Sequence, residues 1–389
     1  MLSKRLLQFG NFSEENKLTS IKKNLEERNV PFLDLTSSNP TNLGLEFPDP
    51  ILRHLLESVN LSHYNPEVKG LESARNSISN FYAERGYTVS KESIYLTPST
   101  SDSYSYLFKL LTNPGDEVLT PSPGYPLFSY LSSMENLNEI HYPLVKRDAV
   151  WEYDVESILN VTSTKTKIIC LVSPANPTGS QLNKNFWLEW KESRCQIPIL
   201  IDEVFYGYDG SDEFQDRQTF PTDADFPLFI LNGISKMFCL PNWKLGWILS
   251  ANSDHRLENG LELILDTYLS TNTIIQSILP QIFQWKPMIQ NKTKTRIQRN
   301  FRIASDLLSD SKYQVLPYQG GWFLVLKLPE LANDELFCET LLEKKAVLIY
   351  PGKWFGFSHN ESYGIISLIT EEETFRLGIE KILVFNQIV

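Results

Sequence analysis

Four polar residues of this 389-residue chain follow one another in an order that could support chemistry on an amine. They are Asn176 in SPANPTG, Asp202 in LIDEVFYGY, Lys236 in NGISKMF and Lys244 in LPNWKLGW. Each alone has an ordinary explanation, because Asn-Pro-Thr-Gly forms turns, aspartates cap helices and lysines are usually solvated. Together they supply an amine that can form an imine with an aldehyde and a carboxylate that can keep a ring nitrogen protonated.

Three of these residues follow apolar segments that are typical of buried strands. Asn176 comes after KIICLVS, Asp202 ends IPILID, and Lys236 follows PLFILN. Segments that are apolar on both faces predict strands of a buried, mostly parallel sheet. Because ligands of open α/β sheets bind at the carboxyl ends of the strands, we expect the three side chains to share one site there.

The rest of the chain predicts a layered α/β architecture. From about residue 70, short apolar runs alternate with helical stretches such as LESARNSISNFYAER and SDSYSYLFKLL. Helices should therefore cover both faces of the sheet. The expected strands are 93–97, 117–121, 139–144, 167–173, 197–202, 227–232 and 245–250.

The chain is too long for one ordinary hydrophobic core, which predicts a large domain and a smaller one. Residues 257–285 and 291–310 predict helices, the second of them largely exposed. The segments YQVLPYQGGWFLVLKLP and AVLIYPGKWFG after them predict a small α+β unit. We expect an N-terminal segment over 1–47 that packs with the small domain and covers the site, a large domain over 48–288 and a small C-terminal domain over 289–389.

Composition argues against several kinds of partner. Lys and Arg total 36 against 47 Asp and Glu, a formal net charge of −11 that disfavours nucleic acid and anionic membranes. The four cysteines form no Cys-x-x-Cys pair, which argues against a metal site or a disulfide framework. The start lacks the apolar core of a signal peptide, and no apolar run is long enough to span a bilayer. We therefore expect a cytoplasmic protein.

Over nearly its whole length the sequence resembles the class I/II aminotransferases, enzymes of pyridoxal 5′-phosphate (PLP) fold type I. The resemblance rests on SSNPTNLGL, HYNPEVKGLESAR, LTPSTSDSYSYLFKLLTNPGDEVLTPSPGYPLF, the four polar sites and PGKWFG. It implies the aspartate aminotransferase-like fold, with a mostly parallel seven-stranded sheet in the large domain. It also implies transamination, in which an amino donor gives its amino group to PLP and a 2-oxo acid takes it up.

The resemblance implies a role for each residue around the ring of PLP. Lys236 would hold the cofactor as a Schiff base and, once released, carry the proton that leaves the substrate's Cα. Burial and neighbouring positive charge should lower its pKa. Asp202 would pair with the ring nitrogen, and Asn176 would donate to the ring's 3-oxygen. Tyr125 and Val204 would contact the two faces of the ring. Substrate contacts are implied for Asn39 and Asn176.

The resemblance also implies a phosphate site where Ser99, Thr100 and Ser101 open a helix, because helix N-termini favour anions. Lys244 would pair with the phosphate. Tyr64 would reach it from the other subunit, which implies a homodimer with the site at its interface. Simpler interpretations are a helix cap for the serines and interface or core packing for the tyrosine.

Three positions depart from the family's pattern. Lys244 replaces the usual arginine and loses its planar fork. Phe205 replaces a tyrosine that bonds the 3-oxygen, and Tyr206 should point to the other side of an extended segment. Ile365, in SYGIISLIT, stands where most relatives carry the arginine that clamps the substrate's α-carboxylate. Other arginines could supply the clamp, although we interpret them as surface helix charges: Arg75, Arg296, Arg299 and Arg302.

The missing clamp leaves three explanations open: another cation serves, the alignment is shifted, or the substrate lacks an ordinary α-carboxylate. It also keeps two alternative functions in view. A PLP-dependent lyase or decarboxylase would share the same cofactor residues, because the bond that breaks depends on how the substrate is oriented. A non-catalytic PLP-binding module is the third hypothesis, although such proteins usually append a DNA-binding domain.

Overall fold

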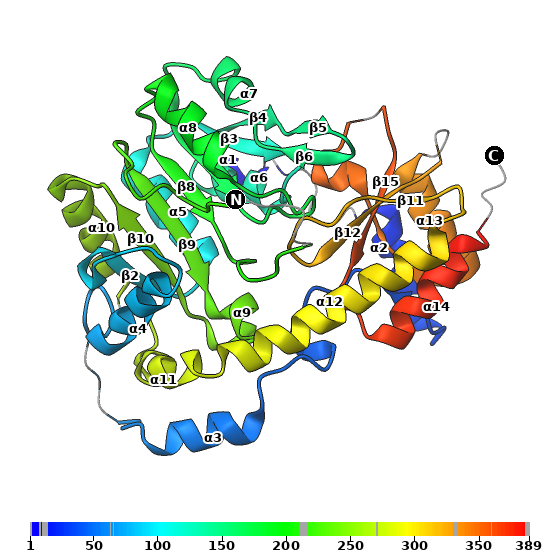
Figure 1. Ribbon diagram of the computed structural model, residues 1–389, viewed down its shortest axis with the longest axis horizontal. Coiled ribbons are helices and arrows are strands. Elements are labelled where there is room, and N and C mark those ends of the chain that lie inside the picture. The colour runs from blue at the N-terminus through cyan, green and yellow to red at the C-terminus, as the bar shows by residue number, and fades with distance from the viewer. Residues whose placement is uncertain are drawn as a thin grey trace.

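The larger part of the molecule is built around a seven-stranded sheet (Figure 1). Its order is β2 (Ile94–Thr97), β10 (Gly246–Ala251), β9 (Leu228–Gly233), β8 (Ile199–Asp202), β7 (Thr166–Val172), β3 (Glu117–Ser122) and β4 (Asn138–Pro143). Strand β10 runs antiparallel to both neighbours, and the other pairings are parallel. This confirms the expected mostly parallel sheet.

The computed structural model describes residues 2–7, 9, 15–62, 64, 66–210, 217–269, 271–329, 333–358 and 360–385. Its remaining helices and strands within the large-sheet half are α3 (Asp49–Glu57), α4 (Glu72–Ala83), α5 (Thr100–Leu111), α6 (Leu127–Met134), β5 (Val145–Arg147), β6 (Val150–Glu152), α7 (Val155–Asn160), α8 (Lys184–Ser193), α9 (Ile234–Met237), α10 (His255–Tyr268) and α11 (Thr273–Phe283). Short 3-10 turns are η1 (Pro40–Asn42), η2 (Lys91–Ser93), η3 (Pro241–Trp243) and η4 (Gly352–Phe355).

Helices cover both faces of the large sheet because its central strands are apolar on both sides. Every residue of β8 and β9 is buried. On one face, Leu200 and Phe229 share a hydrophobic cluster with residues of α5 and α10. On the other, Ile201 and Ile230 belong to the cluster that includes residues of α4 and α8. The alternation of side chains along each strand thus gives the layered arrangement expected from the sequence.

A second sheet is built from the C-terminal part of the chain. Its antiparallel order is β11 (Gln314–Val315), β12 (Phe323–Lys327), β15 (Tyr363–Ser367) and β14 (Tyr350–Pro351). The helices beside it are α2 (Lys17–Glu27), α13 (Asp334–Lys345) and α14 (Glu372–Leu383), and α1 is Lys4–Leu7. Near the N-terminus, β1 (Leu33–Asp34) pairs in parallel with β13 (Val347–Leu348). The long helix α12 (Lys286–Leu308) runs from beside α11 to α14 (Figure 1).

Two helical predictions differ from the structure. The segment expected as one helix over 257–285 is two helices, because Leu269 has a positive φ of 67° and Asn272 caps a new helix. The Asn272 side chain accepts a hydrogen bond from the backbone of Ile274 at 2.9 Å. Helix α12 begins at Lys286 rather than 291, and one of its faces is buried rather than largely exposed.

The hairpin of β5 and β6 joins the first sheet to the second. Lys146 Nζ and Lys327 Nζ each lie 2.7 Å from a carboxylate oxygen of Glu361. Lys146 also donates to the hydroxyl of Tyr363 at 2.9 Å, and the ring of Trp151 packs edge-on against that of Tyr363. One ion-pair cluster therefore holds the β5–β6 hairpin, which follows β4 in the chain, against the four-stranded sheet.

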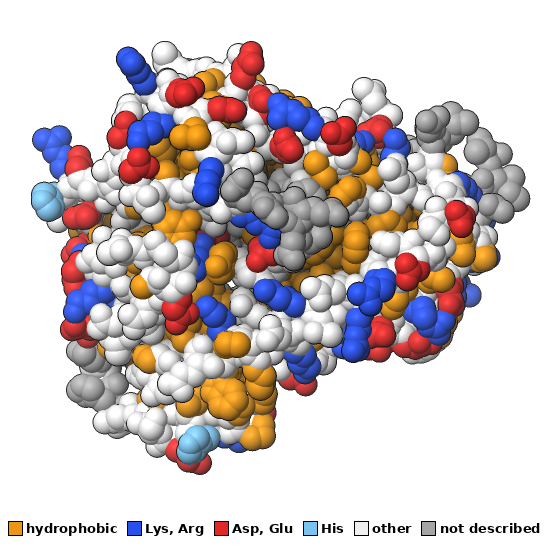
Figure 2. Space-filling model, in the orientation of Figure 1, with side chains coloured by type: hydrophobic (Ala, Val, Ile, Leu, Met, Phe, Trp, Pro, Cys, Tyr) orange, Lys and Arg blue, Asp and Glu red, His pale blue; other side chains and the backbone are white. Residues whose placement is uncertain are grey.

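The described surface mixes acidic and basic side chains (Figure 2). Near the centre of the face in view the surface is hollowed, and hydrophobic side chains gather beside the hollow over the four-stranded sheet. Among the described residues, no helix has the length and apolar character required to cross a membrane.

Candidate active site

Asp202 and Lys236 lie at the ends of neighbouring strands. Asp202 is the last residue of β8, and Lys236 lies in α9, three residues beyond the end of β9. Lys236 Nζ donates to the backbone carbonyl of Ser38 at 3.3 Å and lies 5.0 Å from the ring centroid of Trp322. Burial lowers the pKa of the Lys236 amine, and the charge of Asp202 opposes that shift. The amine is therefore easier to deprotonate than an exposed lysine.

The Asp202 carboxylate is 8% exposed and receives two hydrogen bonds. Tyr104 donates its hydroxyl to Oδ2 at 3.0 Å, and the backbone of Val204 donates to Oδ1 at 3.0 Å. Burial raises the pKa of Asp202 to about 6, although both hydrogen bonds and the charge of Lys236 favour its ionised form. An ionised Asp202 would be stabilised further by any cation that approached it.

Asn176 lies in the turn that follows β7. Its side chain is 9% exposed, and its Oδ1 atom is buried without a hydrogen-bond partner. Buried polar atoms are nearly always paired, so this unpaired oxygen could accept a hydrogen bond from a ligand. The local fold permits this turn because Gly179 has a positive φ of 75° and lies against the backbone of Gly320.

Ser99, Thr100 and Ser101 stand at the start of α5, as the sequence predicts. Ser99 caps the helix: its Oγ accepts from the backbone of Asp102 at 3.1 Å and donates to that residue's carboxylate at 2.6 Å. The Ser99 hydroxyl is therefore already used. Thr100 and Ser101 are partly exposed and occupy the first turn, where backbone N–H groups have no partner within the helix.

Lys244 lies in the turn that precedes β10, a strand that passes the start of α5. It is exposed, has a left-handed backbone with φ of 49°, and comes two residues before Gly246 in β10. A Cβ at Gly246 would lie 3.1 Å from the carbonyl carbon of Ser99 and 3.2 Å from the backbone nitrogen of Thr100. Strand β10 therefore passes close to the start of α5 at Gly246, and Lys244 lies in the turn two residues before that strand residue.

The other expected site residues are more exposed. Tyr125 is 44% exposed, and its pKa is raised by burial and by the charge of Asp202, which places it near that carboxylate. Tyr64 is 60% exposed; His63 and Asn65, which flank it in the quoted motif, lie outside the described residues.

Asn39 is exposed, and its side chain accepts from the backbone of Thr41 at 3.2 Å, where it caps η1. It lies next to Ser38, whose carbonyl contacts Lys236. The N-terminal segment, which the sequence predicts to cover the site, therefore passes Lys236 with its backbone.

Two interpretations made from the sequence are wrong. Residues 204–207 form a turn rather than an extended segment, closed by a hydrogen bond from the backbone of Tyr206 to Glu203 at 2.8 Å. The side chains nevertheless diverge, with Phe205 against Trp322. Arg75 is not a surface charge: it is buried, and its guanidinium donates to the carbonyls of Gly70 and Lys91.

Residues 30–382 match the family model described as aminotransferase class I and II. The chain belongs to the class I and II aminotransferases. It is a pyridoxal 5′-phosphate-dependent aminotransferase, as its relatives' names and the fold support.

Curated relatives extend this similarity over most of the chain. The aminotransferase is 29% identical to the glutamate-pyruvate aminotransferase AlaA of Escherichia coli over 365 residues, 89% of this chain and 88% of that protein. It is 26% identical to the (5-formylfuran-3-yl)methyl phosphate transaminase of Methanocaldococcus jannaschii, over 99% of both chains. The structure superposes on alanine aminotransferase from Pyrococcus furiosus with a TM-score of 0.87 over 98% of both chains, at 19% identity, which supports the fold alone.

The residues at the carboxyl edge of the aminotransferase's sheet fit PLP. A partly buried amine and a buried carboxylate lie at adjacent strand ends, and the buried Oδ1 of Asn176 has no hydrogen-bond partner among the described residues. The open start of α5 beside Lys244 fits an anion. Both ends of a phosphorylated pyridine would therefore meet suitable groups.

Tyr104 is a site residue of the aminotransferase that the sequence did not reveal. It lies in α5, and its hydroxyl crosses to Asp202, which is 98 residues away in sequence. Its spacing could have indicated this role, because Tyr104 lies one helical turn after Thr100, on the buried face of α5. That face points toward the strand ends.

Ile365 is 1% exposed in β15, where it pairs with Val325 of β12 and Tyr350 of β14. The candidate replacement arginines make other contacts. Arg296 donates to the carbonyl of Thr370 at 3.3 Å, and Arg299 lies 3.4 Å from Glu372. Arg302 is exposed on α12.

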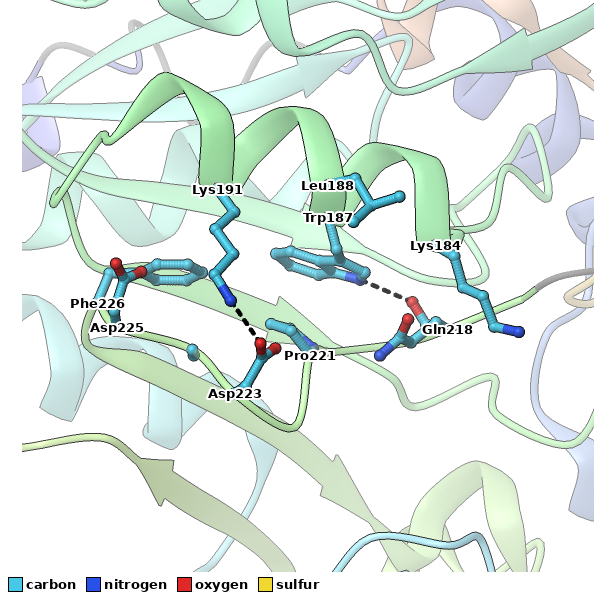
Figure 3. Close-up of a pocket in the computed structure, with 10 residues that line it drawn as sticks. Lys184, Trp187, Leu188, Lys191, Gln218, Pro221, Asp223, Asp225 and Phe226 are labelled. Atoms are coloured by element: carbon cyan, nitrogen blue, oxygen red, sulfur yellow. Dashed lines mark hydrogen bonds and ion pairs between the residues drawn. The ribbon is translucent and has the colours of Figure 1, made fainter.

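A separate pocket of 210 Å³ lies between α8 and residues 218–226 (Figure 3). Trp187 and Phe226 form part of its lining, and Lys191 pairs with Asp223 at 2.5 Å across it. None of its lining residues is an expected site residue of the aminotransferase. We assign the chemistry to the edge of the sheet.

Proposed function

We propose that the aminotransferase carries out transamination at the strand ends that bear Asp202 and Lys236. The observation that carries this assignment is that a partly buried amine of lowered pKa follows the end of β9 while a buried carboxylate ends the paired strand β8. When bound, PLP supplies an aldehyde that can carry an amino group and a pyridine ring that can accept an electron pair.

Lys236 is the residue that holds PLP as a Schiff base through Nζ. A neutral amine is required both to attack an aldehyde and to take a proton, and burial at this position favours the neutral form. When it is not bonded to the cofactor, Nζ would be the base that takes the proton from the substrate's Cα and returns it as an acid. The contact with the Ser38 carbonyl holds the amine on the side of the loop that covers the substrate.

Asp202 faces the ring nitrogen and keeps it protonated. A pyridinium cation opposite the carboxylate favours its ionised form, which burial alone disfavours. Asn176 binds the ring's 3-oxygen and the substrate, Tyr125 stacks on one ring face and Val204 packs on the other. The backbone of Val204 already donates to Asp202, so the residue that contacts the ring also orients its counter-ion.

The phosphate binds at the start of α5, to Ser99, Thr100 and Ser101, with Lys244 as the counter-charge. A helix N-terminus and an exposed lysine on the neighbouring strand are both suited to an anion. Because the Ser99 hydroxyl already caps the helix, its contribution comes through the backbone.

The active enzyme is a homodimer in which Tyr64 of the partner subunit reaches the phosphate. The exposed apolar side chains of this half of the molecule support a partner surface, since such groups gain free energy when covered. Those that are more than half exposed include Leu61, Tyr64, Tyr268 and Leu269.

We further propose a division of the chain at about residues 47 and 288, with the N-terminal segment over the site, and a cytoplasmic location. The two separate sheets support the division, and the acidic composition supports the location. Asn39 would contact the substrate from the covering segment.

The donor is an amino acid or amine and the acceptor a 2-oxo acid or aldehyde. Ile365 favours substrates without an α-carboxylate, because a carboxylate placed against a buried aliphatic chain would lose its hydration without gaining an ion pair. The name of the Methanocaldococcus jannaschii relative refers to such a substrate, a formylfuran phosphate. A lyase or decarboxylase remains the second candidate, because it would use the same cofactor residues and differ only in which substrate bond is oriented to break.

Borohydride reduction of the PLP-loaded protein tests the assignment. The expected product is a pyridoxyl group on the peptide that contains Gly233–Met237. A label on another lysine, or none, would contradict the assignment. Mixing the unreduced protein with amino acids and amines, while its visible spectrum is recorded, then separates the candidates: transamination converts the cofactor to its amine form, whereas a lyase releases pyruvate or carbon dioxide without an acceptor.

A further inference from the structure

Glu203, the residue after Asp202, lies in a buried group of polar side chains behind the site. Its side chain is 0% exposed. Arg85 donates to both of its oxygens, at 2.8 and 2.7 Å. Tyr82 donates its hydroxyl at 2.8 Å, and Asn232 donates its side-chain amide at 3.1 Å, both to Oε1. We refer to Glu203, Arg85, Tyr82 and Asn232 as the Glu203 network.

Aromatic side chains contact the network on the side away from the site. The guanidinium of Arg85 lies 3.6 Å from the ring centroid of Tyr206, and the hydroxyl of Tyr82 accepts from the indole of Trp247 at 3.1 Å. A buried ion pair does not reliably add stability, because desolvating two charges offsets their attraction. Its fixed geometry is therefore the property to explain.

Asn232 connects Glu203 to the strand that leads to Lys236. Asn232 precedes Gly233, the last residue of β9, and its side-chain oxygen accepts from the backbone of Gly233 at 2.7 Å. Its side-chain nitrogen donates to Glu203. The backbone of Glu203 also donates to the carbonyl of Leu231 at 2.9 Å. Glu203 is thus joined to the end of β8 through the chain and to the end of β9 through hydrogen bonds of its backbone and its carboxylate.

We propose that Glu203 is a positioning residue, which fixes the separation of Asp202 from Lys236 through Asn232. This inference rests on the proposed function, in which those two side chains act on opposite ends of one rigid pyridine ring. Because the ring has a constant length, the protein must hold the two groups at a matching separation. A misplacement of about 1 Å costs roughly 100-fold in rate.

The sharpest test is Asn232→Ala. It removes the hydrogen bond between Asn232 and Glu203 and leaves those from Arg85 and Tyr82 to Glu203. The matched control is Thr219→Ala, which removes the 3.3 Å contact between Arg85 and Thr219 on the outer side of the same ion pair. We expect Asn232→Ala to lower turnover per PLP-loaded subunit roughly 100-fold with little change in KM. The midpoint of the visible-absorption pH titration should move, and PLP should dissociate faster. Thr219→Ala should leave all four measurements at wild-type values.

A purely structural role predicts a different result. Asn232→Ala would then lower the thermal midpoint while turnover per loaded subunit and the titration midpoint stayed at wild-type values, and the proposal would be overturned. If Asn232→Ala does not fold, Glu203→Gln, which conserves volume and one acceptor oxygen, is measured in the same way and judged by the same result. Borohydride labelling of wild-type Lys236 keeps the two proposals apart, because labelled Lys236 with an unaffected Asn232→Ala defeats this inference alone.

Discussion

The two ends of the candidate cofactor site are built differently. At the ring end, Asp202 is buried, Lys236 is partly buried, and both are already hydrogen-bonded within one chain, through Tyr104, Val204 and Ser38. At the phosphate end, Lys244 and Tyr64 are exposed, and the start of α5 is partly open to solvent. The ring end resembles a protein interior, whereas the phosphate end resembles a surface.

This contrast indicates which end controls chemistry and which end controls retention. Charges in a buried site interact strongly and keep their orientation, so small changes there should alter turnover. Exposed charges are screened by water and salt, so changes there should alter mainly the affinity for PLP. Four substitutions can break or sharpen the comparison.

Lys236→Ala should have the largest effect. Without its amine the enzyme loses both the covalent attachment and the proton carrier, so turnover should fall by at least about 10⁴-fold while the fold is retained. Steady-state assays and circular dichroism measure the two properties. Lys184→Ala, at the pocket beside α8, is the matched control and should turn over normally. Wild-type turnover of Lys236→Ala would mean that another lysine is the catalytic one.

Asp202→Asn should lower turnover about 10²- to 10³-fold and stabilise the PLP-free protein at high pH. Because burial raises the pKa of Asp202 from 3.8 to about 6, the protonated form stabilises the fold below about pH 3.8, and this contribution is lost as the pH rises through 6. The PLP-free variant should exceed wild type by on the order of 3 kcal/mol at pH 8 and differ little at pH 4. Urea unfolding of both PLP-free proteins at the two pH values measures this difference. Equal stability of variant and wild type at pH 8 would contradict the burial of an ionised Asp202.

Tyr104→Phe should reduce turnover about tenfold, the value of one hydrogen bond to a charged group. The hydroxyl of Tyr104 favours the ionised form of Asp202, so its loss should raise the pKa of that carboxyl further. The acid limb of the pH–rate profile should therefore move to higher pH. Tyr106→Phe, on the same helix but not in contact with Asp202, provides the control. An unmoved acid limb in Tyr104→Phe would separate Tyr104 from the chemistry.

Lys244→Ala should have the smallest effect, a rise of roughly three- to tenfold in the dissociation constant for PLP. The effect should shrink as salt is added, because the lysine is exposed. Turnover at saturating PLP should stay within about twofold of wild type, and Lys244→Arg should bind at least as tightly as wild type. A large fall in turnover at saturation would show that the two ends are not separate in function.

The sequence predicted the sheet well because strand signals are local. The strand expected over 167–173 is β7 at Thr166–Val172, and 227–232 is β9 at Leu228–Gly233. The break between α10 and α11 was missed, since the cap residue Asn272 was not recognised as a helix start and Leu269 adopts a positive φ that leucine rarely has. Breaks that depend on one unusual backbone conformation leave no pattern in composition.

The candidate site could be predicted only in part. Residues at strand ends, such as Asp202 and Lys236, follow from the order of elements. Their partners do not, because Tyr104 is 98 residues from Asp202 and Arg85 is 118 residues from Glu203. The burial of Arg75 was missed for another reason, since its acceptors are backbone carbonyls, of Gly70 and Lys91, which no residue type reveals.

The contact between the Ser38 carbonyl and Lys236 connects the lysine to the C-terminal part of the chain. The segment that carries it is fastened to the C-terminal part of the chain, where Leu35 donates to the carbonyl of Leu348 at 3.0 Å. Any rotation of that part would pull Ser38 away from Nζ of Lys236, 3.3 Å from it. Because the short strands β1 and β13 hold this segment, rotation of the C-terminal part and exposure of the Lys236 amine would occur together.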